Sequence, residues 1–508
     1  MSVSLADLLD SLPDGPVVWD AHEALERSAL LERVERLASA LRSAGVGRNQ
    51  VVSAMFPNRA VAVVGLFAVW KIGAVYNPLN PRASDMDVTS ALERVEPVLV
   101  MTVEEHAGRF AGRLMLSEQE GTWTLSGSSK TSQAPGTSRA TEADGVALIQ
   151  FTSGTTGQPK AVPMRHATVL DLIDRVISAL RSTSRTAQEP PPRPLPNLIP
   201  VSVSLWGGIY QILFAFRAGA PVILMDRFDT LVFAQLVAEH QLRTTVLPPA
   251  ALTMLVDDER IKTIEPLKRV RSITAPLAPI QARRFYERFG VVVLNAYGQT
   301  ELGGEVVGWT SPDQRAFGLE KIGSVGRPHQ GVSVRVVGED GEPAAAGDTG
   351  ELWVRTPSTA AGEVADSLSD RLDAEGWFRT GDVGSLDADG FVWVTGRVSD
   401  MINRGGLKVF PAEVEDVLVA FPGVIDASVV GAPDERLGEV PYAFVVTDDS
   451  PFSADELRDF SRARLSSYKV PVGFEVVSAL PRNEVGKVLK RELIDRLRLT
   501  PTIETSDG

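Results

Sequence analysis

The sequence contains no cysteine, and this absence removes several classes of site at once. Without a thiol there is no disulfide, no thiolate metal ligand and no cysteine nucleophile. Histidine is scarce as well, and its spacing does not form the pairs that a zinc site needs. The five histidines are His22, His106, His166, His240 and His329.

Positive charge is also in deficit, with 51 basic residues against 65 acidic ones and a net charge of −14. A protein this negative repels nucleic acid and anionic lipid. We therefore expect no nucleic-acid partner, and we expect any anionic ligand to bind in a locally basic pocket.

Long hydrophobic runs are missing too. The strongest apolar run, Ala60 to Trp70, has about half of the roughly 20 residues that a membrane span needs, which indicates a buried helix. The first residues, Met1 to Leu12, carry acidic rather than basic charge and no long apolar core, unlike a secretory signal. We expect a soluble, cytoplasmic protein with no integral membrane span.

The patterns that are present predict an α/β protein of two or three folded units, since domains usually have about 100–200 residues and the chain has 508. Residues 24–44 have clear helical periodicity, and short β-rich runs such as Val51 to Met55 alternate with helical stretches such as Val169 to Leu180. This alternation predicts buried sheets with helices packed on their faces. From Val332 onward, shorter strands and frequent turn signals predict a small antiparallel β subdomain.

A domain boundary is expected near Gly396 to Asp400, after which a compact α+β pattern runs to about Leu499. This divides the chain into a large N-terminal domain, residues 1–396, and a small C-terminal domain, residues 397–508. Two polar segments rich in Ser, Thr, Pro and Gly, 126–143 and 181–196, are expected to be surface loops.

The most informative segment runs from Phe151 to Lys160, where a predicted strand leads into the sequence TSGTTGQPK. Glycines let backbone N–H groups approach phosphate oxygens closely, Ser and Thr hydroxyls add donors, and Lys160 supplies charge. The spacing is not that of the helix-cradled P-loop, and the composition alone fits an ordinary turn as well as a phosphate site. The candidate phosphate-binding residues are Thr152, Ser153, Gly154, Thr155, Thr156, Gly157 and Lys160.

This segment resembles the phosphate loop of the adenylate-forming superfamily, which includes the AMP-dependent acyl-CoA synthetases, luciferases and peptide-synthetase adenylation domains. Further signatures of the superfamily follow in the expected order: NAYGQTE (295–301), GWFRTGD (376–382), GRVSD (396–400), RGGLKVFPAEVE (404–415) and PRNEVGK (481–487). The resemblance covers nearly the whole chain. It implies an N-terminal domain that binds ATP and an organic acid, and a mobile C-terminal domain.

Members of this superfamily join a carboxylic acid to AMP and then pass the acyl group to a thiol, so the resemblance implies ATP, Mg²⁺ and coenzyme A as cofactors. The carboxylate attacks the α-phosphate of ATP and pyrophosphate leaves. Because two anions must meet, the site needs a divalent metal and cationic side chains. By resemblance, the catalytic residues are Lys487 in the first half-reaction, Thr300 at the α-phosphate and Glu301 as the Mg²⁺ ligand.

The same resemblance implies further contacts with the nucleotide and the thiol. Tyr297 would cover the adenine, Asp382 would accept hydrogen bonds from the ribose, and Arg397 would act at the ribose and phosphate. The remaining expected contacts are Asn295, Ala296, Ala275 and Pro276 at the nucleotide, Arg227 near the CoA phosphate, and Gly405 and Gly406 in the thiol tunnel. Glycines suit a narrow tunnel because it leaves no room for a Cβ.

The expected acid pocket departs from that of many relatives, which carry glycine where this chain has Ile273. A branched side chain there would fill space that a long acyl chain uses. No aspartate stands where amino-acid-activating members anchor the substrate's ammonium. We therefore expect a compact apolar carboxylic acid, either aromatic or short to medium aliphatic. The expected substrate-binding residues are Val203, Ser204, Trp206, Ile273 and Thr274.

These features favour an AMP-forming carboxylate–CoA ligase that alternates between two orientations of its C-terminal domain. Ser399 takes the hinge position that is usually Asp or Lys in relatives. Two alternatives stay open: an adenylating enzyme that loads an acid onto an acyl carrier protein, and a non-catalytic nucleotide-binding homologue. The retained Lys487 and Glu301 argue against the second, and free CoA is favoured over a carrier protein because no insertion typical of fatty-acyl-AMP ligases is evident.

Overall fold

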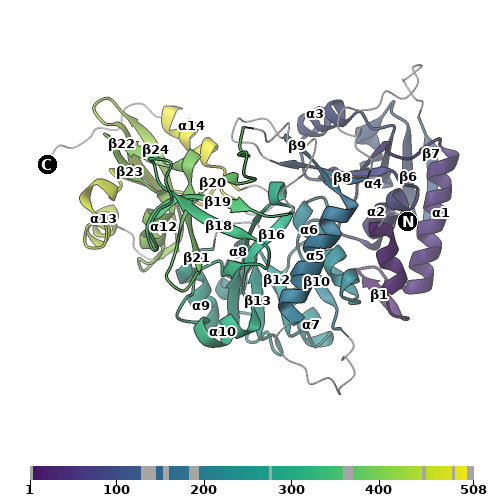
Figure 1. Cartoon of the computed structure of the whole chain (residues 1–508), viewed down its shortest axis with the longest axis horizontal. Coiled ribbons are helices and arrows are strands. Elements are labelled where there is room, and N and C mark those ends of the chain that lie inside the picture. The colour runs from purple at the N-terminus through teal and green to yellow at the C-terminus, as the bar shows by residue number, and fades with distance from the viewer. Residues whose placement is uncertain are drawn as a thin grey trace.

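The computed structural model describes residues 4–127, 145–152, 160–181, 194–273, 277–357, 370–448, 453–482 and 487–499. Within these ranges the chain forms six β-sheets with helices between them, which confirms the predicted α/β class. The N-terminal elements lie at one end of the molecule, and the last strands and helices gather at the other (Figure 1). Among the described residues, no helix is long and apolar enough to cross a membrane.

The N-terminal part is built on a seven-stranded sheet in the order β7-β6-β5-β3-β4-β8-β9, in which only the outer strands β7 and β9 pair antiparallel. Its strands are β3 (Val51–Met55), β4 (Val75–Pro78), β5 (Leu99–Val103), β6 (Met115–Gln119), β7 (Thr122–Ser126), β8 (Val146–Thr152) and β9 (Lys160–Arg165). The accompanying helices are α1 (Arg27–Ser43), α2 (Ala60–Lys71), α3 (Asp85–Val95), α4 (Glu104–Ala107) and α5 (His166–Arg181). Strand β3 is buried along its whole length, as expected for a central parallel strand.

Two of these helices test the sequence patterns directly. Helix α2 is buried on almost every side, as its unbroken apolar run predicted. The helix predicted to begin at Ala24 instead begins at Arg27, because Ala24–Glu26 forms the edge strand β2 and pairs with β1 (Pro16–Trp19).

The middle of the chain contributes three smaller sheets. One has the order β10-β11-β1-β2, one is the parallel sheet β12-β13-β14, and one is the antiparallel sheet β15-β16-β17. The strands are β10 (Asn197–Ile199), β11 (Val222–Leu224), β12 (Thr244–Leu247), β13 (Arg269–Ser272), β14 (Val292–Asn295), β15 (Tyr297–Gln299), β16 (Gly304–Gly308) and β17 (Arg327–Pro328). The helices are α6 (Trp206–Arg217), α7 (Thr230–Glu239), α8 (Pro249–Asp257), α9 (Pro279–Phe289) and α10 (Ser311–Phe317).

The antiparallel subdomain predicted after Val332 is present as the sheet β18-β19-β20-β21. The C-terminal region then adds a five-stranded sheet with its own apolar core, which includes Val414, Leu418 and Val445. The strands are β18 (Ser333–Val337), β19 (Thr349–Arg355), β20 (Phe378–Leu386), β21 (Val392–Arg397), β22 (Ile402–Arg404), β23 (Leu407–Val409), β24 (Val424–Asp434), β25 (Gly438–Thr447) and β26 (Gly473–Val476). The helices are α12 (Pro411–Val419), α13 (Ala454–Arg462) and α14 (Lys490–Leu499).

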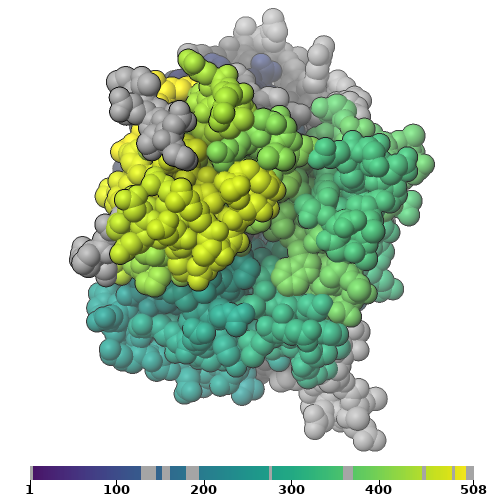
Figure 2. All heavy atoms as spheres, turned by 90° about the vertical axis from the view of Figure 1, so that its left-hand side faces the viewer, coloured from purple at the N-terminus to yellow at the C-terminus, as the bar shows by residue number. Residues whose placement is uncertain are grey.

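The C-terminal region packs against the rest of the chain through α12, which contacts β21 and α9. Figure 2 looks onto this end and shows the yellow surface of the last elements lying against the teal and green surface of the middle of the chain. Lys408 on β23 also forms an ion pair with Glu339, in the turn between β18 and β19. This arrangement brings the end of the chain to the elements that carry the predicted nucleotide-binding residues.

Candidate active site

A buried carboxylate, Asp382 on β20, is the centre of the predicted nucleotide side. The antiparallel register of β20 and β21 places Asp382 opposite Arg397, whose Nε lies 3.0 Å from Asp382 Oδ1. Tyr297 on β15 donates its hydroxyl hydrogen to Asp382 Oδ2 at 2.7 Å, and Gln299 donates to the same oxygen. The Asp382 side chain is only 7% exposed, so these donors both satisfy and orient the carboxylate.

Tyr297 serves this cluster as a neutral donor. Burial raises the pKa of its phenol well above the ordinary value, and the negative charge of Asp382 acts in the same direction. The hydroxyl therefore keeps its proton and donates a hydrogen bond to the carboxylate. Tyr297 and Asp382, which lie in separate sequence motifs, are thus brought into direct contact.

Glu301 lies one short turn further, in a 3₁₀ helix formed by Thr300–Leu302. Arg371 Nη1 lies 3.8 Å from Glu301 Oε1, and the same guanidinium donates to the carbonyl oxygens of Arg379 and Thr380. Arg371 therefore holds Glu301 beside the strand that carries Asp382.

The donor set at Glu301 fits the predicted magnesium ion. Mg²⁺ usually takes one or two protein carboxylates and completes its sphere with phosphate oxygens and water. Across the described part of the chain, no group of three or more His, Asp or Glu side chains forms an alternative metal site. A single hard carboxylate matches this preference, so Glu301 is the residue that would hold the predicted ion.

Lys487, near the end of the chain, is influenced electrostatically by the same cluster. Burial lowers the pKa of its ammonium below the ordinary value and the positive charge of Arg397 lowers it further, whereas Asp400 and Asp382 act in the opposite direction. These influences place Lys487 within electrostatic range of the Asp382–Arg397 pair. The predicted catalytic lysine and the predicted ribose-binding residue therefore lie within electrostatic range of each other, although they come from different regions of the chain.

The predicted phosphate loop connects two antiparallel strands. Thr152 ends β8 and Lys160 begins β9, and the backbones of these two residues pair. The residues of this prediction that lie outside the described ranges are Ser153, Gly154, Thr155, Thr156 and Gly157.

The predicted adenine-side residues are only partly described. Asn295 is buried at the end of β14, and the N–H of Ala296 donates to the Ser272 carbonyl at 3.1 Å. Thr274, Ala275 and Pro276 lie outside the described ranges.

The acid-side residues cluster around the start of α6. Val203 and Trp206 are buried, and the backbone carbonyl of buried Ser204 accepts a hydrogen bond from Gln150 at 3.3 Å. The Trp206 indole N–H donates to the Gly303 carbonyl at 3.1 Å, which ties α6 to the turn that carries Glu301. Ile273 is half-buried at the end of β13.

The two tunnel glycines lie apart from the nucleotide side. Gly405 and Gly406 form the turn between β22 and β23, and both are exposed. Both residues have positive φ angles, 58° and 91°, which explains the glycine requirement of the turn itself. A Cβ on Gly405 would lie 2.9 Å from Leu437 Cδ2, so the hairpin packs against a neighbouring loop of the C-terminal region.

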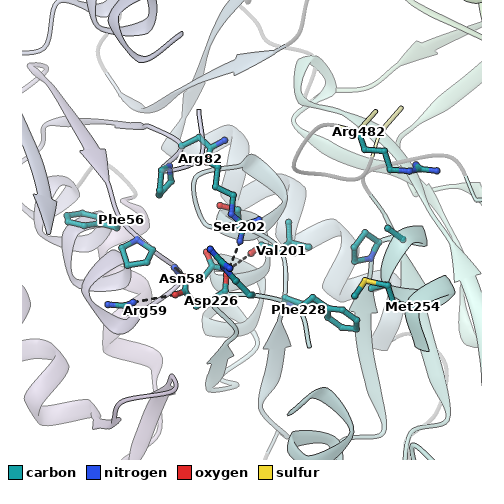
Figure 3. A pocket seen from close by; sticks show the side chains of 18 of the residues that line it. Phe56, Asn58, Arg59, Arg82, Val201, Ser202, Asp226, Phe228, Met254 and Arg482 are labelled. Carbon is teal, nitrogen blue, oxygen red and sulfur yellow. Dashed lines mark hydrogen bonds and ion pairs between the residues drawn. The ribbon is translucent and has the colours of Figure 1, made fainter. Parts of the chain in front are cut away.

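A basic cavity of about 770 Å³ lies between the N-terminal elements and the C-terminal region (Figure 3). Arg59, Arg82, Arg227 and Arg482 line it together with acidic and aromatic side chains. Arg59 points toward Asp226, 3.4 Å away, and Arg482 lies on the opposite wall. Arg227, predicted to contact a CoA phosphate, therefore lies on the wall of a cavity with several cationic groups.

Several residues of the site were missed by the sequence patterns. Gln299 lies inside the YGQTE motif, so its position beside Tyr297 gave a usable signal. Arg371 lies eleven residues before Asp382 without a distinctive spacing, and only the fold reveals its contact with Glu301.

Comparison with known proteins places the chain in a family. The chain matches the family described as AMP-binding enzyme over residues 9–362, and the AMP-binding enzyme C-terminal domain over residues 413–487. It is 32% identical to a feruloyl-CoA synthase from Amycolatopsis sp., with 95% of this chain and 96% of the relative covered. The chain belongs to the AMP-binding enzyme family.

Solved structures agree with this assignment. The amide bond synthetase McbA from Marinactinospora thermotolerans superposes with a TM-score of 0.82 at 27% identity, covering 98% of this chain and 99% of that chain. The o-succinylbenzoate coenzyme A synthetase from Bacillus subtilis, in complex with ATP and magnesium ion, superposes with a TM-score of 0.81 at 25% identity, covering 96% and 98%. The predicted superfamily and the predicted class, an AMP-forming acid–CoA ligase that uses ATP, Mg²⁺ and CoA, are confirmed.

Proposed function

We propose that this chain uses one cleft to activate a small carboxylic acid as its acyl-adenylate, and then transfers the acyl group to CoA. The observation that carries the proposal is the buried Asp382–Arg397 pair on β20 and β21, which lies within electrostatic range of Lys487 from the end of the chain. A nucleotide held at Asp382 would thus have a cation next to its reacting phosphate.

In the first half-reaction the protein's task is to hold two anions together. Asp382 has carboxylate lone pairs left for ribose hydroxyls after accepting from Tyr297, Gln299 and Arg397. Glu301 would hold Mg²⁺, which neutralises phosphate charge when bound. Lys487 would offset the charge that develops as the carboxylate oxygen bonds to the α-phosphorus and the pyrophosphate oxygen departs.

The second half-reaction needs a thiol at the same carbon. We place the division between the two domains at residues 396 and 397, and the C-terminal domain, residues 397–508, would rotate there to present Gly405 and Gly406. Ser399, in the 3₁₀ helix Val398–Asp400, lies at this hinge. A hinge motion of this kind needs only a few residues to change their dihedral angles.

The basic cavity supports free CoA as the thiol donor. CoA carries phosphates, and Arg82 and Arg227 bring positive charge to this cavity on a protein whose net charge is −14. Arg482, on the opposite wall, is paired with Asp426. The acid would bind among Val203, Ser204, Trp206, Ile273 and Thr274. We assign this activity to the cytoplasm, where ATP and CoA are both available.

The test is pyrophosphate release by purified protein with ATP and Mg²⁺ across a panel of carboxylic acids. We expect release with at least one acid in the absence of CoA, and AMP and an acyl-CoA when CoA is added. Transfer only to a phosphopantetheinylated carrier protein would favour the carrier-loading alternative. ATP binding without pyrophosphate release from any acid would contradict the proposal and indicate a non-catalytic homologue.

A further inference from the structure

One face of α6 lines up aromatic side chains beside the turn that carries Glu301. Trp206, Tyr210 and Phe214 recur at four-residue spacing, with ring centroids 5.8 and 6.2 Å apart. This face meets β16 at Gly304, where a Cβ would lie 3.3 Å from Trp206 Nε1 and 3.7 Å from Tyr210 Cε2. Tyr210 therefore lies one helical turn beyond Trp206, on the side of α6 that we assign to the acid.

The Tyr210 hydroxyl group has no hydrogen-bond partner among the described residues. It is buried, yet it forms no hydrogen bond with any described residue. The residue as a whole is half-buried, whereas its hydroxyl oxygen is not exposed to solvent. A buried hydroxyl without a partner is costly and uncommon in native proteins, and a bound ligand that completes the hydrogen bond accounts for its retention.

Two opposite charges, those of Arg271 and Glu305, act on Tyr210 and are paired with each other. Arg271 on β13 forms an ion pair with Glu305 on β16, and His329 Nε2 lies 2.9 Å from Glu305 Oε1. Burial raises the pKa of the Glu305 carboxyl, but Arg271 and His329 outweigh burial, so the pKa lies below its ordinary value. Glu305 is therefore ionised and cancels the charge of Arg271.

The neutralised Arg271–Glu305 pair limits which substrate groups can bind next to Tyr210. Burial raises the pKa of the Tyr210 phenol, and the charge of Glu305 adds to the effect, so the hydroxyl stays protonated and can donate. Because Arg271 is neutralised in advance, a second carboxylate on the acid would find no unpaired cation in this group. An uncharged oxygen that accepts a hydrogen bond fits better.

We infer that Tyr210 is a specificity-determining residue, which donates a hydrogen bond to an uncharged oxygen at the end of the acid remote from its carboxylate. The inference rests on the proposed function and refines the expectation of an apolar acid. The acid keeps an apolar body against Trp206 and Ile273 but carries a hydroxyl, ether or ketone oxygen at its far end.

The test compares pairs of acids that differ only in this oxygen. Aromatic acids with a para-hydroxyl or para-methoxyl group would be matched with para-hydrogen and para-methyl analogues and with a para-carboxylate, and CoA-free pyrophosphate release would give kcat/KM. We expect wild type to favour the oxygenated member by about tenfold or more, the range of one satisfied buried hydrogen bond, and to disfavour the dicarboxylate. The same comparison with aliphatic pairs covers a non-aromatic substrate.

The variant Tyr210→Phe removes the donor and keeps the ring. We expect it to bring the kcat/KM ratio of each pair close to one, mainly through KM. Tyr442→Phe, which removes a hydroxyl in the C-terminal region, should leave the ratio at the wild-type value, and unfolding midpoints would confirm that both variants fold.

The possible failures are distinguishable. If no acid releases pyrophosphate, the proposed function fails. If wild type adenylates acids but treats the members of every pair alike, or prefers the dicarboxylate, only the inference about Tyr210 is overturned. An equal loss for both members of a pair in Tyr210→Phe, with no change in their ratio, would also overturn it.

Discussion

Replacing Lys487 by alanine should separate the two half-reactions. Lys487 is half-buried within electrostatic range of Asp382 and Arg397, and removing one preorganised charge or donor from such a site typically costs about 10²–10³ in rate. The lowered pKa of Lys487 shows that burial already opposes its charge, so we expect the lower end, about 10²-fold. Lys490→Ala provides a matched control, because Lys490 Nζ instead pairs with Glu415 Oε1 at 2.8 Å.

The assay measures each half-reaction separately under single-turnover conditions. Pyrophosphate release from ATP and the acid, without CoA, reports the first step, and thioester formation from a preformed acyl-adenylate and CoA reports the second. Lys487→Ala should lose the first step and largely keep the second, whereas Lys490→Ala should keep both. An equal loss of both steps in Lys487→Ala would refute the role of Lys487. A loss of the first step in Lys490→Ala as large as that in Lys487→Ala would refute it as well.

Three further predictions follow from the charged groups. Because the pKa of Lys487 lies below its ordinary 10.5, CoA-free pyrophosphate release should decline at a lower pH than an ordinary lysine titrates, and Lys487→Arg should move the decline upward. Asp382→Asn should raise the KM for ATP at least about tenfold and lower the unfolding midpoint, because it breaks the pair with Arg397 and places an amide against existing donors. Burial, followed by the charge of Glu415, raises the pKa of Asp416 to about 7, so Asp416→Asn should stabilise the fold by up to about 4 kcal/mol at pH 8.

The sign for Asp416 follows from proton linkage. The folded state holds its proton more tightly than the unfolded state, whose carboxyl titrates near 3.8, so stability is full below pH 4 and is lost as the pH rises to about 7. Denaturant unfolding at pH 5 and pH 8 should therefore show a larger gain for Asp416→Asn at the higher pH. A stability gain that does not change with pH would contradict the reasoning for Asp416. An Asp382→Asn variant with an unaltered KM for ATP would contradict the role of Asp382. An unshifted pH profile in Lys487→Arg would contradict the assignment of the high-pH decline to Lys487.

Local patterns predicted the parts of the fold that depend on local burial. The apolar run of α2 became a helix buried almost all round, and the β-rich run at Val51–Met55 became a central strand. The predicted start of α1 at Ala24 was wrong, because Ala24–Glu26 has helical periodicity in its sequence but pairs with β1 in the fold. Strand pairing depends on residues far away in sequence, so a local pattern cannot reveal it.

The candidate site divides in the same way. Tyr297, Glu301 and Asp382 could be selected because each lies in a motif with a recognisable residue order. Arg371 and Tyr210 could not, because an arginine before a turn and a tyrosine on an amphipathic helix are ordinary in sequence. Their importance depends on a guanidinium 3.8 Å from Glu301 and on a hydroxyl left without a partner among the described residues.

The ion pair between Lys408 and Glu339 has a consequence for the balance between the two reaction steps. It fastens the segment just after Gly405 and Gly406 to the turn between β18 and β19, so the rotation that we propose must break it. Its side chains are 35% and 75% exposed, so the pair contributes at most about 1 kcal/mol and weakens as salt is added. Raising the ionic strength should therefore weaken this ion pair, and so slow acid activation and speed thioester release.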